Sequence, residues 1–209
     1  MIRLFAILAI CILSGGCAVG VQHSYSAADT KFDITADSKV AVAVHDRRPY
    51  VVSGDKAGNF VGLQRAGFGN PYDVTTESSK TLANDFAAAI VAALEAGGTA
   101  VQNVSVLPEE SDAAAEKKLL ATKTERGVLV TIRDWKTDTY VNTKLIFDVV
   151  LRVFDSTGKE RAKTGVRGED NLGGSNFNPP AHARKAVPPA FREQLKTLFN
   201  NPKIVAALK

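Results

Sequence analysis

The chain has 209 residues, of which 45% are hydrophobic and 23% charged, and its formal net charge is +4. This length suffices for one folded domain with a core of its own, and so small a charge excludes the dense basic surface of a nucleic-acid-binding protein. A mildly basic surface suits anionic envelope material, and it suits an ordinary solvated surface equally well.

The amino-terminal residues have the pattern of a bacterial lipoprotein signal. Arg3 precedes an unbroken apolar run, residues 4–13, and Ser-Gly-Gly then leads to Cys17. The run is too short to span a membrane, which takes about 20 residues, whereas small side chains before a thiol suit cleavage and acylation there. Ser14 occupies the position where the common lipobox has leucine, so a secretory peptide with an incidental Cys17 is the alternative. We expect residues 1–16 to be a signal peptide and Cys17 to be lipidated, with palmitate among its acyl chains.

The cysteines and the composition predict how the mature chain begins. Cys11 leaves with the signal and Cys17 is acylated, so the mature fold would have no free thiol and no disulfide. Residues 17–37 are short of bulky apolar side chains, which predicts a lipidated, flexible tether with a reach of roughly 20–25 Å. Residues 38–209 would then form a single α+β periplasmic domain.

A strand is expected at residues 39–44, where valines alternate with alanines. Just after it, Asp46 and Arg48 could form an ion pair that orders the root of the next segment. We expect the pair to be structural, and the alternative is that Arg48 faces a ligand. Residues 50–75 hold five glycines among Val, Phe and Tyr, which predicts a long functional or mobile loop with a possible short strand at 60–64.

Helical patterns follow this glycine-rich segment. Thr76 is a fair start for an amphipathic helix whose apolar stripe reaches Leu94, before a Gly-Gly stop. A short strand at residues 101–107 comes next, and Ser111 can cap a second helix that reaches about Thr122.

The strongest β signal consists of three strands, at residues 127–135, 144–154 and 159–169. A turn ending in Gly158 joins the last two. Charged residues share one face of the third strand, so this meander should have one wet and one dry face. Near the first hairpin, Trp135 and Tyr140 form either an exposed aromatic patch for a partner or a sheet edge tucked under a loop.

The chain ends in helical patterns. A helix is expected at about residues 182–200, interrupted or restarted at Pro188-Pro189, because proline removes a helical hydrogen bond. A short helical tail follows at residues 202–208. The resulting order, β-α-β-α-β-β-β-α, predicts an α+β fold: a mainly antiparallel sheet with helices packed on one face.

Residues that could carry catalysis do not converge. The sequence has no nucleophile elbow, no phosphate-binding loop and no dinucleotide fingerprint. His23, His45 and His182 have no second ligand at helical or hairpin spacing, so no metal and no cofactor is expected. Asp134 and Asp148 lie on neighbouring predicted strands, where solvated carboxylates are more common than a catalytic dyad. We therefore expect that the protein is not an enzyme.

A family resemblance rests on the order of these elements. Cys17, the strand at 40–44 followed by Asp46-Arg47-Arg48, and the amphipathic helix ending at Gly97 resemble the YajG-like outer-membrane lipoproteins of bacteria. The resemblance covers most of the mature chain and implies a membrane-anchored periplasmic domain without known catalysis. Ala18 is not the aspartate that marks inner-membrane retention in enteric-type bacteria, so the resemblance favours the outer membrane.

Together these patterns predict a non-catalytic envelope lipoprotein, an accessory or binding component of envelope assembly or transport. Acyl chains on Cys17 would hold it on the periplasmic side of the outer membrane. Its partner would be an envelope protein, a glycan or an anionic lipid, and no nucleic acid is expected. Two alternatives stay open: an enzyme acting on envelope glycans through Asp46, Asp134 and Asp148, and a structural lipoprotein that associates with itself.

Overall fold

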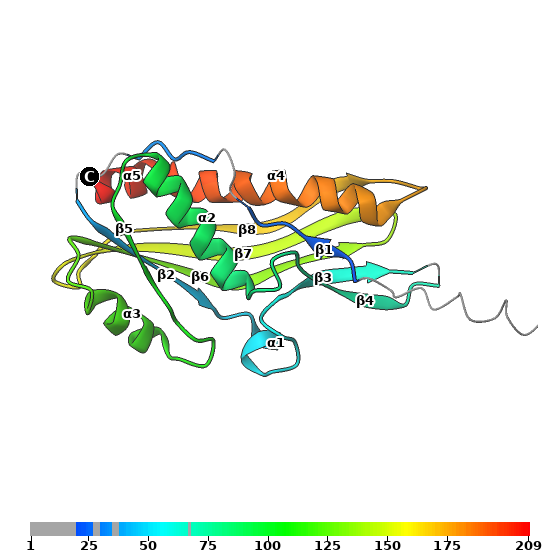
Figure 1. The fold of residues 1–209 in the computed structure, drawn as a ribbon, viewed down its shortest axis with the longest axis horizontal. Helices are drawn as coiled ribbons and strands as arrows, with labels where there is room; N and C mark the ends of the chain where they lie inside the picture. Colours follow the sequence, from blue (N-terminus) through cyan, green and yellow to red (C-terminus); the bar gives the residue numbers. More distant parts are fainter. Residues whose placement is uncertain (1–19, 27–29, 35–37, 67) are drawn as a thin grey trace, which may run out of the picture.

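One eight-stranded sheet runs the length of the molecule (Figure 1). The structure is a computed structural model that describes residues 20–26, 30–34, 38–66 and 68–209. An antiparallel meander of three long strands forms one side of the sheet: β6 (Arg126–Thr139), β7 (Asn142–Asp155) and β8 (Glu160–Gly174). Alternation of apolar and polar residues along β7 gives it one buried face, as expected of a half-covered strand.

Two groups of shorter strands pair with different halves of β6. Beside its first half lie β2 (Val40–Asp46), parallel to β6, and β5 (Val101–Val104), parallel to β2. Beside its last residues lie β3 (Phe60–Arg65), parallel to β6, then antiparallel β4 (Pro71–Thr76) and, parallel to β4, β1 (Gln22–His23). The longest pairings are therefore antiparallel, whereas β2, the central short strand, has parallel neighbours on both sides.

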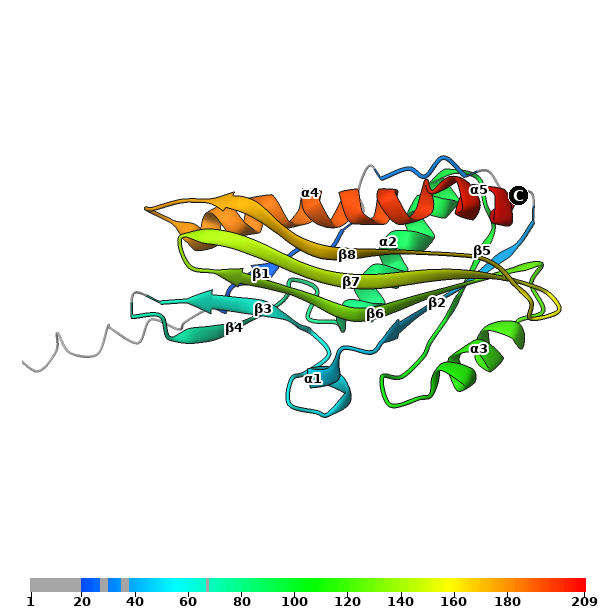
Figure 2. The same cartoon turned by 180° about the vertical axis from the view of Figure 1, so that it is seen from behind.

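Within the described residues, the helices beside this sheet are α1 (Pro49–Val52), α2 (Leu82–Ala96), α3 (Asp112–Leu120), α4 (Pro179–Phe199) and α5 (Pro202–Leu208). The predicted α+β class is confirmed. α2, α4 and α5 cover one face, and Figure 2 shows α4 lying along β8 for most of its length. α3 instead packs on the opposite face, so helices lie on both sides of the sheet. Among the described residues, no helix is both long and apolar enough to cross a membrane.

The alternation in β2 explains why α3 lies on the opposite face. Its valines face the main core, whereas Ala41 and Ala43 face the other way and contact α3 through Ala115 and Leu119. Every residue of β2 is buried, as is usual for a strand covered on both faces. The small alanine side chains let a short helix approach closely, and the sequence pattern alone does not reveal this second covering layer.

The main core is built around aromatic side chains between α2, α4 and the sheet. Phe86 and Phe191 lie edge to face at a centroid distance of 4.8 Å, and Trp135 lies 5.1 Å from Phe86 and 5.8 Å from Phe191. Edge-to-face pairs of this kind stabilise a core beyond the area they bury.

The predicted interruption at Pro188-Pro189 is wrong, because α4 is continuous from Pro179 to Phe199. Its buried stripe passes through the prolines without a break: Ala183, Val187, Phe191, Leu195 and Leu198. The prolines leave the carbonyls of Arg184 and Lys185 without their helical donors, but both residues are exposed, so water can reach those carbonyls. Packing of the stripe outweighs the local cost.

The predicted tether is also wrong over the part of residues 17–37 that the structure describes. His23 and Tyr25 are buried at 0% and 3% exposure, and Phe32 and Ile34 at 5% and 2%. Phe32 stacks on Phe199 of α4 at a centroid distance of 4.3 Å. Buried and exposed residues alternate along this segment, which therefore lies against the core as an extended strap. Its bulky apolar residues are few and separated by polar ones, so the sequence shows no apolar run there.

The glycine-rich segment, predicted as a loop over residues 50–75, is structured. It forms α1 and the β3–β4 hairpin, and the predicted short strand is confirmed as β3. The predicted helix start at Thr76 is wrong: Thr76 belongs to β4, and the N-cap of α2 is Thr81, whose side chain accepts from the Asn84 amide. The predicted cap at Ser111 is confirmed, as is the positive φ of Gly158, which is 85°.

Candidate functional site

The chain enters the fold at one end of the sheet. Cys17 lies outside the described residues, and the first described residue is Gly20. Gln22 and His23 pair in parallel with Thr75 and Thr76 of β4, so the residues before β1 approach from the side where β4 begins. β4 begins at the tip of the β3–β4 hairpin. The lipidation candidate is therefore tied to this end by three peptide links, which span at most about 11 Å.

Exposed aromatic residues gather at the same end. Among the described residues, five of the six exposed large hydrophobic side chains lie in three neighbouring connections: Phe68 at 98% exposure, Tyr72 at 57%, Tyr140 at 49%, Val141 at 40% and Phe177 at 99%. These connections join β3 to β4, β6 to β7 and β8 to α4, at the right of Figure 1. We call this set of five residues the aromatic end.

The three connections contact one another. The Ser175 amide donates to the Val141 carbonyl at 3.1 Å, which joins the β8–α4 connection to the β6–β7 turn. A shallow cavity of about 400 Å³ lies between Tyr72, Tyr140, Val141 and Pro180. Three separate parts of the sequence therefore meet at the aromatic end.

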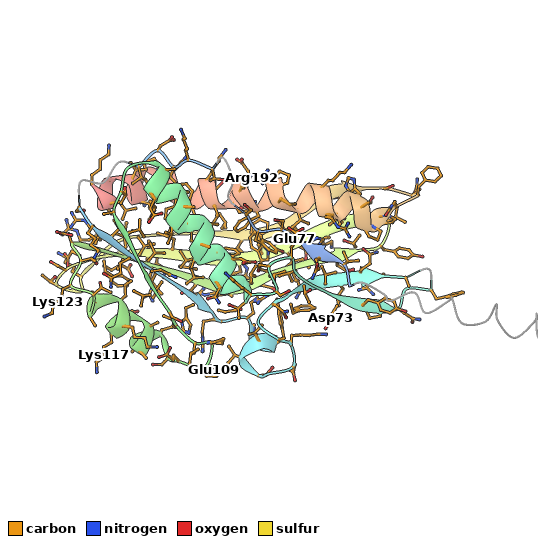
Figure 3. All side chains as sticks on the ribbon, viewed as in Figure 1. Asp73, Glu77, Glu109, Lys117, Lys123 and Arg192 are labelled. Carbon is orange, nitrogen blue, oxygen red and sulfur yellow. The ribbon has the colours of Figure 1, made fainter. Side chains whose placement is uncertain are left out.

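The three connections carry no charge, and Arg65 and Asp138, which border them, pair with each other at 2.6 Å. No residue in 66–72, 139–143 or 172–181 is charged, in a chain in which 23% of residues are. The other end of the meander is different: its turn includes Asp155, Lys159 and Glu160, and Lys123 projects beside α3 (Figure 3). Exposed apolar side chains gathered in charge-free connections are typical of interaction surfaces.

Arg48 and Asp46, predicted as a pair, are buried at 0% and 1% exposure. Nε and Nη2 of Arg48 donate to the two carboxylate oxygens of Asp46 at 2.8 and 2.7 Å. The guanidinium also donates to the carbonyls of Phe60 at 2.6 Å, Gly58 at 3.0 Å and Trp135 at 3.3 Å. Burial acts to lower the pKa of Arg48, but the hydrogen bonds and charge of Asp46 outweigh it, and the net shift is upward. This pair orders the root of the glycine-rich segment, and in this position it does not face a ligand.

Trp135 and Tyr140 do not share a surface. Trp135 is fully buried, and its Nε1 donates to the Tyr25 hydroxyl at 3.2 Å. Tyr140 belongs to the aromatic end. Phe68 and Phe177 were missed by the sequence reasoning, although both lie in charge-free stretches rich in Gly, Asn and Pro, which is the available signal.

The carboxylates considered for catalysis each have a neighbouring partner. Asp134 and Asp148 are cross-strand partners in the β6–β7 register. Asp134 accepts from the Tyr50 hydroxyl at 3.0 Å and from Lys136 at 3.3 Å, whereas Asp148 lies 3.6 Å from Arg167. They are brought together, but each has a different neighbouring cation, Lys136 for Asp134 and Arg167 for Asp148.

The three histidines lie apart. Nε2 of His23 is 3.2 Å from the Thr137 hydroxyl, and burial lowers the pKa of His23 to about 4. Nδ1 of His45 is 3.3 Å from Asp112, and burial lowers its pKa too. Nε2 of His182 is 3.0 Å from the Leu172 carbonyl. In the part of the chain that the structure describes, no group of three His, Cys, Asp or Glu residues could hold a metal ion.

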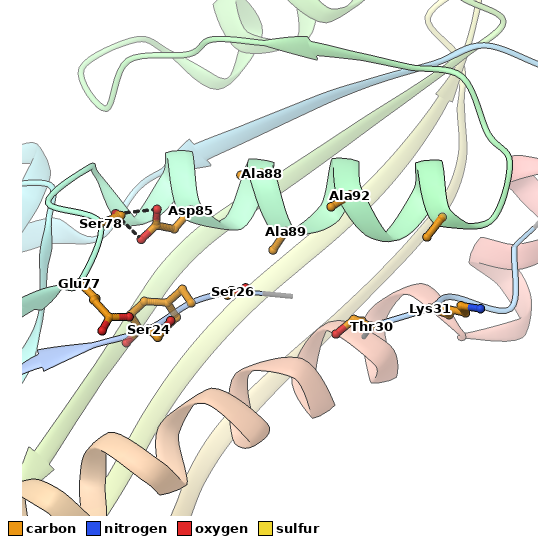
Figure 4. A pocket seen from close by; sticks show the side chains of 12 residues that line it. Ser24, Ser26, Thr30, Lys31, Glu77, Ser78, Asp85, Ala88, Ala89 and Ala92 are labelled. Atoms are coloured by element: carbon orange, nitrogen blue, oxygen red, sulfur yellow. Dashed lines mark hydrogen bonds between the residues drawn. The ribbon is translucent and has the colours of Figure 1, made fainter. Parts of the chain in front are cut away.

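A second concave feature lies between α2 and the strap (Figure 4). This groove has a volume of about 700 Å³, and alanines of α2 form one wall: Ala88, Ala89, Ala92 and Ala96. The Ser78 hydroxyl is 2.8 Å from both carboxylate oxygens of Asp85, whose pKa is raised by burial. Residues 27–29 of the strap lie outside the described residues, and we assign no ligand to the groove.

Comparisons with known proteins show similarity in fold. No protein-family model matches the sequence, and no curated protein matches it. The solved structure of protein XCC0632 from Xanthomonas campestris, a DUF330 protein, aligns with a TM-score of 0.51 over 85% of this chain and 94% of that one, at 10% identity. At this identity the similarity shows the fold alone.

Lipoprotein GNA1162 from Neisseria meningitidis aligns with a TM-score of 0.37 over 75% of this chain and 99% of that one, at 11% identity. The PelC dodecamer from Paraburkholderia phytofirmans gives 0.39 over 82% and 91%, at 12% identity. These scores are too low to support an argument about this chain. The resemblance to YajG-like lipoproteins stays a prediction.

Proposed function

We propose that the protein is a lipid-anchored component of the bacterial cell envelope that works by binding a partner rather than by catalysis. The observation that carries this proposal is the short link between the lipidation candidate and the folded domain. Cys17 closes a lipoprotein-type signal, and the chain is already packed into the sheet at Gln22 and His23. An acylated Cys17 would hold the domain directly at a membrane surface, without the long tether.

The anchor would be strong. Each buried methylene contributes about 0.8 kcal/mol, so a single acyl chain binds a membrane marginally, whereas two or three make binding effectively permanent. Ala18 after the cysteine favours the periplasmic side of the outer membrane, through the lipoprotein resemblance. A YajG-like accessory role in envelope assembly or transport belongs to the same proposal.

The described polar groups support binding over catalysis. Asp46 is neutralised by a buried arginine, and Asp134 and Asp148 each have a neighbouring cation. A general acid or base must reach the substrate proton within hydrogen-bond distance. Asp46, at 1% exposure, does not meet this requirement. These contacts disfavour the alternative of a glycan-acting enzyme that uses these three carboxylates.

Crosslinking in intact cells, followed by affinity purification, tests the proposal. We expect one envelope protein, glycan or lipid to be recovered with the wild-type chain and to be lost with Cys17→Ser, which lacks the anchor, and circular dichroism establishes that this variant is folded. Asp148→Asn is the matched control, because it removes a carboxylate while leaving the anchor intact. Recovery of no envelope component above background would contradict a binding role. So would a loss of partner recovery with Asp148→Asn as complete as the loss with Cys17→Ser.

A further inference from the structure

We propose that the aromatic end is a membrane-seating surface: its side chains insert into the interfacial layer of the bilayer to which Cys17 is anchored. The inference rests on the proposed function, since it needs acyl chains on Cys17. It adds a second contact with the lipid, made by the folded domain itself. It also gives the domain a fixed orientation on the membrane.

The exposure of the side chains is the first argument. Phe68 and Phe177 are 98% and 99% exposed, so their rings make almost no contact with the rest of the described chain. A phenylalanine that only fills space in the fold would be buried, because its transfer out of water is favourable. Tyr72 and Tyr140, at 57% and 49%, combine an apolar ring with a polar hydroxyl, the combination found where one side is apolar and the other wet.

The absence of charge is the second argument, and it favours lipid over a polar protein surface. A charged group carried into an apolar layer costs far more than an apolar ring gains. The three connections contain no Asp, Glu, Lys or Arg over residues 66–72, 139–143 and 172–181. The polar residues they contain are Asn, Ser, Thr and Tyr, which can hydrogen-bond to headgroups.

The path of the chain is the third argument. β1 runs parallel to β4 with Gln22 opposite Thr75, so Val21 and Gly20, the described residues before it, lie on the side of the hairpin tip. Cys17 is bound to Gly20 through three peptide links, a span of at most about 11 Å. Acyl chains on Cys17 would therefore enter the bilayer within a short chain length of the end of the sheet that carries the exposed aromatic residues.

The seating predicts an orientation for the whole domain. β7 has 14 residues and runs away from the aromatic end, which corresponds to about 45 Å at the usual rise per residue. Its far turn, residues 155–158, would therefore project away from the lipid, with α3 near that end (Figure 1). Charged residues of that end, such as Lys123, would face the aqueous phase.

Tryptophan reporters test this geometry. The sequence has a single Trp, Trp135, and it is fully buried. The fluorescence of a Trp added on the surface is therefore obtained as the difference from that of the wild-type protein. Full-length acylated protein carrying Phe68→Trp or Phe177→Trp is reconstituted into phosphatidylethanolamine–phosphatidylglycerol vesicles with brominated acyl chains. Ser156→Trp, in the exposed far turn, is the matched control. Mass spectrometry of each preparation establishes that Cys17 is acylated.

We expect the added fluorescence at positions 68 and 177 to fall by about half or more, because rings seated about 5–10 Å into the interface contact the brominated chains. The added fluorescence at position 156 should not change. Equal quenching at all three positions would overturn the orientation. If the protein is acylated but the Trp at positions 68 and 177 is not quenched, the seating is overturned and the anchor proposal stands. A blue shift of the emission of these Trp residues when the protein self-associates would then assign this end to contact with a second copy. Protein exported without acylation would instead contradict the proposed function.

Discussion

Arg48 and Asp46 form a two-pronged ion pair from which solvent is excluded, with Nε and Nη2 at 2.8 and 2.7 Å from the two carboxylate oxygens. The same guanidinium donates to carbonyls of the glycine-rich segment and of β6. One side chain therefore fixes the position of β3, and through it the β3–β4 hairpin that carries Phe68 and Tyr72.

Removing one partner of this pair should be strongly destabilising. We expect Asp46→Asn to lower the free energy of unfolding by about 3–5 kcal/mol, because it leaves a buried charge without compensation. Arg48→Lys should not rescue the fold, since an ammonium group cannot make the planar two-pronged contact. Urea unfolding followed by circular dichroism measures both. Arg65, which pairs with Asp138 near the surface at 2.6 Å, supplies the control: a loss for Arg65→Ala equal to that for Asp46→Asn would contradict the role of burial.

The continuity of α4 predicts that Pro189→Ala stabilises the protein. The substitution supplies a backbone N–H for the Lys185 carbonyl, and we expect a gain of about 1–2 kcal/mol after allowing for the greater entropy of the unfolded chain. Thermal unfolding measures this gain. Pro202→Ala, at the first turn of α5 where proline is favourable, should give none. A loss of stability for Pro189→Ala would indicate that the helix is broken there.

Burial of His23 predicts that stability falls on acidification. Its pKa is lowered to about 4 in the fold, by burial first and then by the charge of Arg184 on α4, against an unfolded value of 6.5. Between these values the unfolded chain binds more protons, so stability is complete above pH 6.5 and declines as the pH falls toward about 4. The His23 contribution to this loss is roughly 3 kcal/mol.

His23→Gln removes the titration and keeps an amide that can reach the Thr137 hydroxyl. We expect it to flatten the fall in unfolding free energy between pH 6.5 and 4, measured by urea unfolding at several pH values. The carboxylates contribute equally to both proteins, so the difference in slope isolates the histidine. Identical slopes for the two proteins would show that His23 is not the titrating group.

Gly62 is required where β3 meets β6. Its φ is 151°, and a Cβ there would collide with the hydroxyl, the carbonyl oxygen and the amide nitrogen of Thr137. We expect Gly62→Ala to cost about 3 kcal/mol of unfolding free energy, from backbone strain and overpacking together. Gly54→Ala is the matched control, because Gly54 has a φ of 81° and open space around it. This substitution should lower the unfolding free energy by about 1 kcal/mol. Fluorescence of the buried Trp135 during urea unfolding measures the unfolding free energy of both variants. Equal losses for the two variants would contradict the close approach of Gly62 to Thr137.

The parts of the fold set by local pattern were predictable from the sequence. Strict alternation located β7, and the Ser111 cap and Gly158 turn were correct, because each depends on a few neighbouring residues. The strap at residues 30–34 was not, since Phe32 gains its stability from Phe199, far along the chain. The glycine-rich segment is ordered by Arg48 through contacts that composition does not show.

The aromatic end required the topology. Tyr140 was selected from the sequence, but it was paired with Trp135, which is buried. Phe68, Tyr140 and Phe177 belong to three loops that approach one another only because β3 and β7 both lie beside the end of β6. No periodicity links them, so the surface they form becomes visible only in the folded chain.

The mass of the amino-terminal peptide of protein purified from bacterial membranes tests the lipid anchor directly. We expect residues 1–16 to be absent and Cys17 to carry a diacylglyceryl thioether, with no such species in the Cys17→Ser variant. An amino terminus elsewhere, or an unmodified Cys17 in membrane-bound protein, would contradict the anchor and the function proposed from it.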